Sequence, residues 1–71
     1  MRITYDPEAD AMYIKLKEGQ FARNEEIKEG IILDLGPEGE LLGIEILEVS
    51  LRYSLKEISH LDIEMPLVAK Q

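Results

Sequence analysis

Cysteine is absent from this chain of 71 residues, and histidine occurs once, as His60. Without cysteine there can be no disulfide and no thiolate metal site, and one imidazole cannot build a histidine-based metal cage within one chain. We therefore expect no cofactor. Stability must come from packed apolar side chains, some of them supplied by a second chain, because a domain of this length is near the lower limit of what folds unaided.

Basic residues are also scarce, since 8 lysines and arginines stand against 15 acidic residues and the formal net charge is −7. This balance opposes the counterion release by which proteins bind nucleic acids, and it opposes attraction to anionic membranes. No apolar run approaches the roughly 20 residues of a membrane span. The first residues, Met1 to Thr4, lack the apolar stretch of a signal peptide. We expect a cytoplasmic protein that binds neither nucleic acid nor membrane.

Isoleucine, leucine and valine together supply 21 residues, which is enough for a packed core and argues against disorder. Four segments show the two-residue apolar alternation of β-strands. They are residues 2–5, 11–16, a segment that starts between 25 and 30 and ends at 35, and 41–49. Residues 17–24 are polar and are predicted to form a loop.

Turn sequences connect these segments. In the stretch from Asp6 to Asp10, Pro7 presets φ for a turn and Asp6 can accept a hydrogen bond from the backbone that follows. Residues 36–39, with the sequence Gly-Pro-Glu-Gly, are a second strong turn signal. Gly30 suggests a bulge or a late strand start. The pattern predicts a four-stranded antiparallel meander.

A helical period replaces the strand period after Val49. Leu51, Leu55 and Ile58 recur at helical spacing, and the sequence from Ser54 to Glu57 fits a capping box, with Ser50 as a rival helix start. We predict an α+β fold in one domain, with a sheet over residues 1–49, a helix over 50–62 and a tail over 63–71. The helix is expected to lie across one sheet face, the face of Met12, Ile14, Leu33 and Ile44. The tail is a further strand, an arm onto a neighbour, or disordered.

Two segments carry a resemblance to a known family. The first runs from Tyr5 to Leu16 with the sequence YDPEADAMYIKL, and the second joins ILDL at 32–35, a turn with Gly39, and LGIEIL at 42–47. Over residues 2–50 they resemble the small prokaryotic family catalogued as domain of unknown function 2283 (DUF2283). The resemblance implies a compact α+β protein and no known activity, so no catalytic residue is carried over. Some relatives look like neighbours of small toxin-like proteins, which suggests an antitoxin role as a hypothesis. The usual alanine after the last strand is Ser50 here.

Three acidic residues in the first turn form a candidate metal site. Asp6, Glu8 and Asp10 alternate like the first half of a calcium loop. A full loop needs glycine at its sixth position and a bidentate glutamate at its twelfth, where this chain has Ala11 and Lys17. Turn chemistry is the simpler interpretation, and a metal site is the alternative.

A second candidate is the carboxylate pair of Asp34 and Glu45, which the predicted register places on one face of adjacent strands. Paired carboxylates can carry out acid–base chemistry if one pKa is raised, so a small metal-dependent hydrolase is the alternative function. Lys15 or Arg2 could equally neutralise the pair. The ring of Tyr13 is expected to cover the bare backbone of Gly43, while His60 is expected to be structural or exposed.

The strand over residues 41–49 looks apolar on both faces, which is more than one short helix can cover. We predict a homodimer or higher assembly with the second face or a sheet edge at the contact, and interface residues Tyr13, Ile32, Leu47 and Val49. Cover by Leu67 and Val68 of the same chain is the alternative. The expected function is a non-enzymatic interaction or oligomerising module, and the net charge would steer it toward a basic protein partner.

Overall fold

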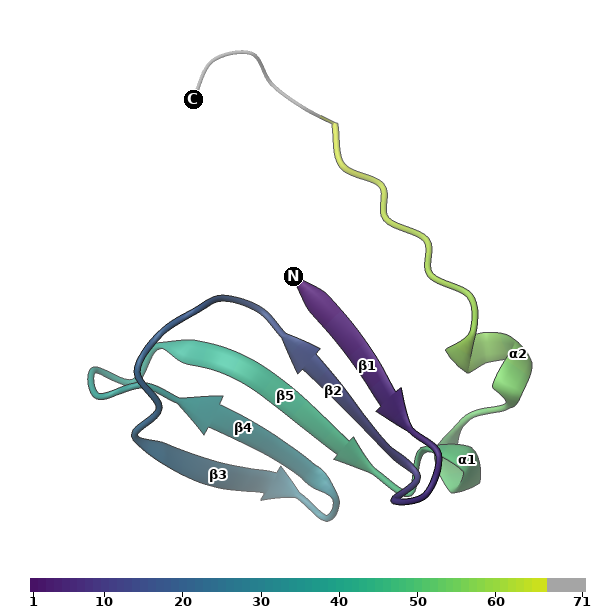
Figure 1. The fold of residues 1–71 in the computed structure, drawn as a ribbon, viewed down its shortest axis with the longest axis horizontal. Coiled ribbons are helices and arrows are strands. Elements are labelled where there is room, and N and C mark those ends of the chain that lie inside the picture. The colour runs from purple at the N-terminus through teal and green to yellow at the C-terminus, as the bar shows by residue number, and fades with distance from the viewer. Residues whose placement is uncertain (67–71) are drawn as a thin grey trace.

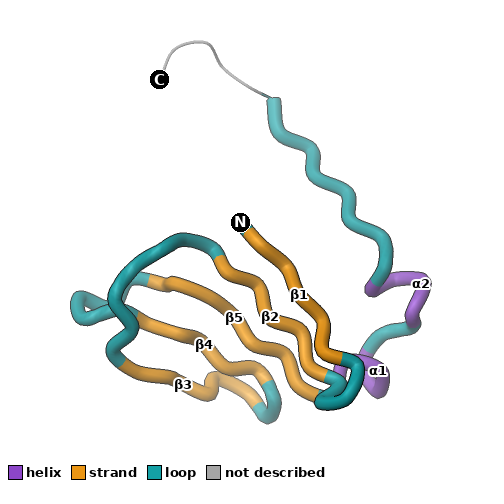
Figure 2. The backbone as a smooth tube through the Cα atoms, in the orientation of Figure 1, coloured by secondary structure: helices purple, strands orange, loops and turns teal. Residues whose placement is uncertain are grey.

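The computed structural model describes residues 1–66 and forms one five-stranded antiparallel sheet with two short helices at one end (Figure 1). The strands and helices are β1 (Arg2–Asp6), β2 (Ala11–Lys15), β3 (Arg23–Lys28), β4 (Ile31–Leu35), β5 (Leu41–Leu47), α1 (Val49–Arg52) and α2 (Leu55–Ile58). The strand order is β1-β2-β5-β4-β3. Figure 2 shows the strands side by side in a single layer.

The predicted four-stranded meander is wrong in both strand number and order. β5 lies between β2 and β4, so the chain must pass from the second strand to an outer strand across the ends of two others. Residues 16–22 make this passage. The Leu16 backbone N–H donates to the Leu42 carbonyl at 2.8 Å, and the Ala22 N–H donates to the Leu35 carbonyl at 2.8 Å. These bonds hold the crossing to the sheet and help to cover Leu35 and Leu42.

The segment expected to be one strand ending at Leu35 is two strands, β3 and β4. They are joined at Glu29 and Gly30, where Gly30 has a φ of 78° that side chains rarely adopt. Gly30 therefore marks a late start of β4, as the sequence suggested. The apolar alternation that predicts strands is absent from the sequence of β3, RNEEIK, so β3 is not predicted as a separate strand. A charged sequence suits a strand at the sheet edge, where it hinders pairing with other chains.

Both predicted turns are confirmed. The Asp6 carboxylate accepts from the Glu8 backbone N–H at 3.0 Å, which stabilises the β1–β2 turn. In the β4–β5 turn, the Gly39 N–H donates to the Gly36 carbonyl at 3.0 Å, and Gly39 has a φ of 84°. Local side-chain and backbone chemistry is enough to specify these two turns.

The continuous helix predicted over 50–62 is wrong, because Tyr53 is extended and separates α1 from α2. The capping box is confirmed and begins α2: the Glu57 N–H donates to the Ser54 hydroxyl at 3.2 Å, and the Ser54 N–H donates to the Glu57 carboxylate at 3.1 Å. Each helix has four residues and is too short to cover a sheet face. Within residues 1–66, no helix is long and apolar enough to cross a membrane.

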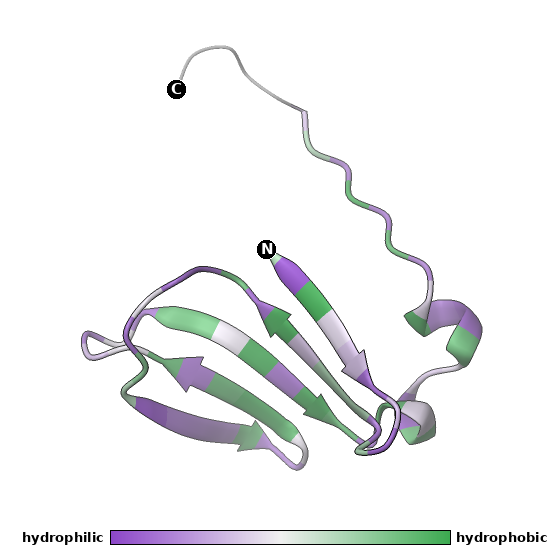
Figure 3. Ribbon diagram, in the orientation of Figure 1, coloured by the Kyte–Doolittle hydropathy of each residue, from purple (hydrophilic) through white to green (hydrophobic). Residues whose placement is uncertain are grey.

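The pairing register sorts the side chains of the sheet into two faces, because residues directly opposite each other point the same way. We call one the apolar face; its cross-strand rows are Ile3–Ile14–Ile44–Leu33 and Tyr5–Met12–Ile46–Ile31, and they end on β3 at Glu25 and Lys28. We call the other the polar face; its rows are Arg2–Lys15–Gly43–Asp34–Asn24 and Thr4–Tyr13–Glu45–Ile32–Glu26. Figure 3 shows the apolar residues concentrated on the inner strands and the polar ones on β3.

The core that the chain closes by itself is small. Among the described residues, the buried apolar side chains are Leu35, Leu42 and Val49. The inner residues of the apolar face are only half-buried, and Ile3 and Tyr5 at its edge are exposed. The fold is therefore a sheet with one apolar side left largely open.

Candidate functional site

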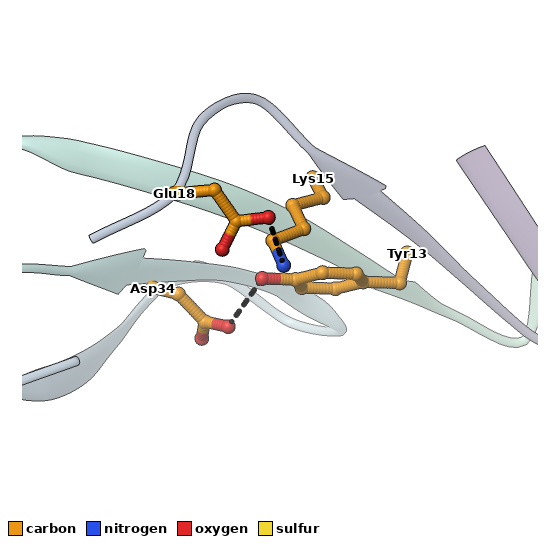
Figure 4. Close-up of polar contacts among 4 residues, drawn as sticks. All are labelled: Tyr13, Lys15, Glu18 and Asp34. Carbon is orange, nitrogen blue, oxygen red and sulfur yellow. Dashed lines mark hydrogen bonds and ion pairs between the residues drawn. The ribbon is translucent and has the colours of Figure 1, made fainter. Parts of the chain in front are cut away.

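A tyrosine side chain on the polar face extends from β2 across β5 to β4 (Figure 4). Tyr13 lies on β2, its ring passes over Gly43 on β5, and its hydroxyl donates to an Asp34 carboxylate oxygen on β4 at 2.9 Å. A Cβ added at Gly43 would lie 2.6 Å from Cζ of Tyr13. The missing side chain at Gly43 is what allows the ring to bridge β2 and β4.

Asp34 is bound on both of its oxygens. Oδ2 accepts from Tyr13, and Oδ1 accepts from the Asn24 side-chain amide on β3 at 2.6 Å. Asp34 and Glu45 share a face of neighbouring strands in the predicted way, at diagonal positions. This geometry makes Asp34 an acceptor in a network that ties β2, β4 and β3 together.

The Tyr13 hydroxyl is held in its protonated form. Burial, and next the hydrogen bond to Asp34, raise the pKa of Tyr13, and the negative charge of Glu45 contributes to the same direction. At neutral pH the hydroxyl therefore acts as a donor. A hydroxyl that keeps its proton and a carboxylate that accepts two hydrogen bonds form a structural pair.

Lys15 forms an ion pair with Glu18 and not with Asp34 or Glu45. Its ammonium group lies 2.8 Å from the Glu18 carboxylate in the crossing after β2 (Figure 4). The hydrogen bond from Lys15 and its charge lower the pKa of Glu18. Both side chains are well exposed, so the pair adds little stability.

Asp10, a candidate metal ligand from the sequence, fastens the first turn to α1. Its carboxylate accepts from the Ser50 hydroxyl at 2.7 Å, from the Ser50 N–H at 3.1 Å and from the Tyr5 hydroxyl at 2.7 Å. The Val49 N–H donates to the Asp10 carbonyl at 3.0 Å. Glu48, at the N-cap of α1, makes no side-chain cap bond, so Asp10 supplies the cap from a distant part of the chain. These bonds, first that of the Ser50 hydroxyl, lower the pKa of Asp10.

Two of the three acidic residues of the turn have separate partners. Asp6 binds the backbone of its own turn, and Asp10 binds Tyr5 and Ser50. Within the part of the chain that the structure describes, no three His, Cys, Asp or Glu side chains are grouped so that they could hold a metal ion.

Arg52 links α1 to the end of β5 and to the turn between β3 and β4. Its guanidinium donates to the Leu47 carbonyl at 2.7 Å and to the Glu29 carbonyl at 2.7 Å. Gly30 leaves the space that the guanidinium occupies. The sequence analysis missed both Arg52 and the link between Asp10 and Ser50. Arg52 and Glu29, like Asp10 and Ser50, lie far apart in the chain, so no local sequence pattern predicts their hydrogen bonds.

Three of the four predicted interface residues are buried to the same intermediate degree as the inner residues of the apolar face. Tyr13, Ile32 and Leu47 are half-buried on the side of the polar face. Val49 is 1% exposed and is covered by its own chain, so its side chain is not available to a partner. Leu67 and Val68, the alternative cover, lie outside the described residues. His60 is exposed just after α2.

The open surface is the apolar face, and one edge of it is hollowed. A groove lies between this face and the segment that begins at Tyr53. Its lining comprises Ile3, Met12, Ile14, Tyr53, Glu57, Ile58, His60 and Leu61. The groove places α2 beside the apolar face at the β1–β2 edge.

The comparisons with known proteins concern the sheet. The family described as "Protein of unknown function (DUF2283)" matches residues 2–50. This range holds all five strands and ends at Ser50, the residue that Asp10 binds. No curated protein and no solved structure matches the chain. Since the match covers well over half of the chain and confirms the resemblance seen in the two motifs, the protein belongs to the DUF2283 family.

Proposed function

We propose that this protein is a non-enzymatic interaction module that associates with a second copy through its apolar face. The observation that carries the proposal is the open state of this face. Its eight apolar side chains lie in two rows across β1, β2, β5 and β4, and α2 flanks them only at the β1–β2 edge. Exposed contiguous apolar surface of this kind marks interaction sites in soluble proteins.

The accessible surface of the chain is large for its mass. The chain exposes 5922 Å², whereas a compact monomer of this mass exposes about 4,500 Å². The radius of gyration is 14.1 Å, against about 11 Å for a compact domain of this length. The extended segment after α2 accounts for part of the excess.

A second copy is the partner that fits the chemistry of this face. The eight side chains carry no charge, and Glu25 and Lys28 at the β3 end cancel. The net charge of −7 therefore resides on the polar face, the turns and the rest of the chain. A neutral apolar face is complementary to itself, so two sheets can pack face to face at about 10 Å in a two-fold dimer.

The test compares two lysine substitutions at adjacent positions of β1. Ile3→Lys places a charge on the apolar face at a side chain that is already 38% exposed. Thr4→Lys adds the same charge on the polar face. We expect a dimer by light scattering for the natural protein and for Thr4→Lys. For Ile3→Lys we expect a dissociation constant raised by at least about tenfold, since burying one isoleucine contributes about 1.5–3 kcal/mol.

A second measurement covers the case in which the monomer does not fold alone. If folding and association are coupled, the melting temperature of the natural protein rises with its concentration. A natural protein that is monomeric and melts at one temperature at all concentrations would contradict the proposal. So would an Ile3→Lys variant as dimeric as Thr4→Lys. If the protein instead binds only a basic partner through its acidic turns, the natural protein alone would be monomeric and would melt at one temperature at all concentrations.

A further inference from the structure

The segment that follows α2 has the pattern of a strand but no strand partner. It leaves the helix as an extended chain and runs away from the sheet (Figures 1 and 2). Leu61, Ile63 and Met65 alternate with Asp62 and Glu64, the two-residue period of a half-buried strand. The three apolar side chains are 64%, 57% and 65% exposed. Beyond the bond from His60 N–H to the Glu57 carbonyl, no backbone hydrogen bond joins the segment to the rest of the described chain.

The sheet offers two free edges to such a segment, β1 and β3. Charge distinguishes them. β3 carries both signs of charge, Arg23 and Lys28 as well as Glu25 and Glu26, but its positions on the polar face are Asn24 and Glu26, which offer no cation to Asp62 and Glu64. β1 carries Arg2, opposite Lys15, and a hollow at this corner has the lining Met1, Arg2, Lys15, Leu16, Lys17 and Glu18. An acidic strand therefore fits the β1 edge and is disfavoured at β3.

The two-residue period of the segment places its apolar and its acidic side chains on opposite faces, and both faces of the β1 edge suit them. If Leu61, Ile63 and Met65 continue the apolar face beside Ile3 and Tyr5, the acidic side chains must point to the other face. That is the polar face, where the row nearest the N-terminus begins with Arg2 and Lys15. Leu61 already lies in the groove with Ile3, on the side of the apolar face. One strand orientation thus places the apolar residues beside Ile3 and Tyr5 and the acidic ones on the face of Arg2.

We propose that residues 61–65 of each chain add to the free edge of β1 in a second copy, so that the two chains exchange strands. The proposal rests on the self-association proposed above. A second copy is favoured over the segment's own sheet because the lone chain leaves the segment unpaired although it starts beside its own β1. Main-chain hydrogen bonds would give the affinity, as in other cases of strand addition.

The experiment replaces one residue of the segment in the full chain. Ile63→Pro removes a backbone N–H and restricts φ, which prevents regular strand pairing. Ile63→Val keeps the N–H, the apolar character and the strand preference, and serves as the matched control. Ile63 is outside the closed core, since its side chain is largely exposed, so both variants should fold. By sedimentation equilibrium we expect the dissociation constant of the dimer to rise about tenfold or more for Ile63→Pro and to change little for Ile63→Val.

A charge exchange tests the choice of edge. Arg2→Glu should weaken the dimer, and Arg2→Glu combined with Asp62→Lys and Glu64→Lys should restore it. Persistence of the dimer in Ile63→Pro, with loss in Ile3→Lys, would overturn strand exchange and leave the face-to-face association intact. A lower melting temperature of Ile63→Pro at unchanged mass would mean that the segment pairs within its own chain, which also overturns the exchange. A monomeric natural protein would overturn both proposals.

Discussion

Replacing Gly43 with alanine is expected to destabilise the sheet because of a side chain on the neighbouring strand. Gly43 lies in the central strand β5, and its backbone is not in the left-handed region, so the main chain itself would accept alanine. The obstacle is the ring of Tyr13. The new Cβ would lie 2.6 Å from Cζ of that ring and 3.0 Å from the Ile14 carbonyl oxygen. The ring must move, and the hydrogen bond to Asp34 must lengthen or break.

The magnitude follows from three opposing contributions. Overpacking of this kind costs about 1–3 kcal/mol. Loss of the Tyr13–Asp34 hydrogen bond costs about 0.5–1.5 kcal/mol. Replacing glycine by alanine in a strand returns about 0.5–1 kcal/mol through lower entropy of the unfolded chain. We expect a net loss of about 1–3 kcal/mol in the free energy of unfolding, and a fall in melting temperature of roughly 4–8 °C for each kcal/mol.

A double-mutant cycle in urea identifies the cause. In a Tyr13→Ala background the ring is gone, so Gly43→Ala should be neutral or stabilising by up to about 1 kcal/mol. The difference between the two backgrounds is the coupling energy, expected at about 1–3 kcal/mol. An equal loss in both backgrounds would refute the reasoning, because the cost would then come from the backbone around Ile14 and not from the tyrosine.

Two further predictions concern pH. Because the pKa of Asp10 is lowered in the folded protein, its stabilisation is present above the ordinary value of about 3.9 and is lost as pH falls through the lower folded value. Ser50→Ala should therefore flatten the acid limb of a plot of melting temperature against pH, and an unchanged limb would contradict the role of this bond. The pKa of Tyr13 is raised, so its stabilisation is present below about pH 10 and is lost as pH rises through the folded value. Tyr13→Phe should lower stability by about 0.5–1.5 kcal/mol at neutral pH and remove this alkaline loss, whereas an identical alkaline limb in both proteins would contradict the assignment.

Features with a local cause could be predicted from the residues alone. The Asp6–Pro7 turn and the turn that ends at Gly39 follow from φ preferences and nearby hydrogen bonds, and both formed as expected. The capping box at Ser54 also depends on only four residues. The shared face of Asp34 and Glu45 followed from alternation along two strands that a short turn connects.

The failures involve partners that are distant in the chain. β3 is polar because it lies at the edge, and periodicity cannot detect a strand that has no apolar face of its own. The insertion of β5 between β2 and β4 depends on pairing between segments separated by the whole crossing. The predicted helix is divided at Tyr53, whose backbone is extended.

The candidate sites show the same division. The sequence singled out Asp10 and Tyr13 as residues of interest, but their partners, Ser50 and Asp34, became visible only in the structure. The interface residues were selected on the assumption that a helix would cover the opposite face. In the structure that face is the open one.

Composition and residues close together in the chain are enough to predict that this protein is rich in β-strands, where its turns lie, that it is acidic and that it belongs to the DUF2283 family. The order of the strands, the network around Asp34 and the face of the sheet that is left open follow from tertiary structure. These depend on how segments far apart in the chain pair and pack, and alternation along a strand defines two faces without saying which of them its own chain will cover.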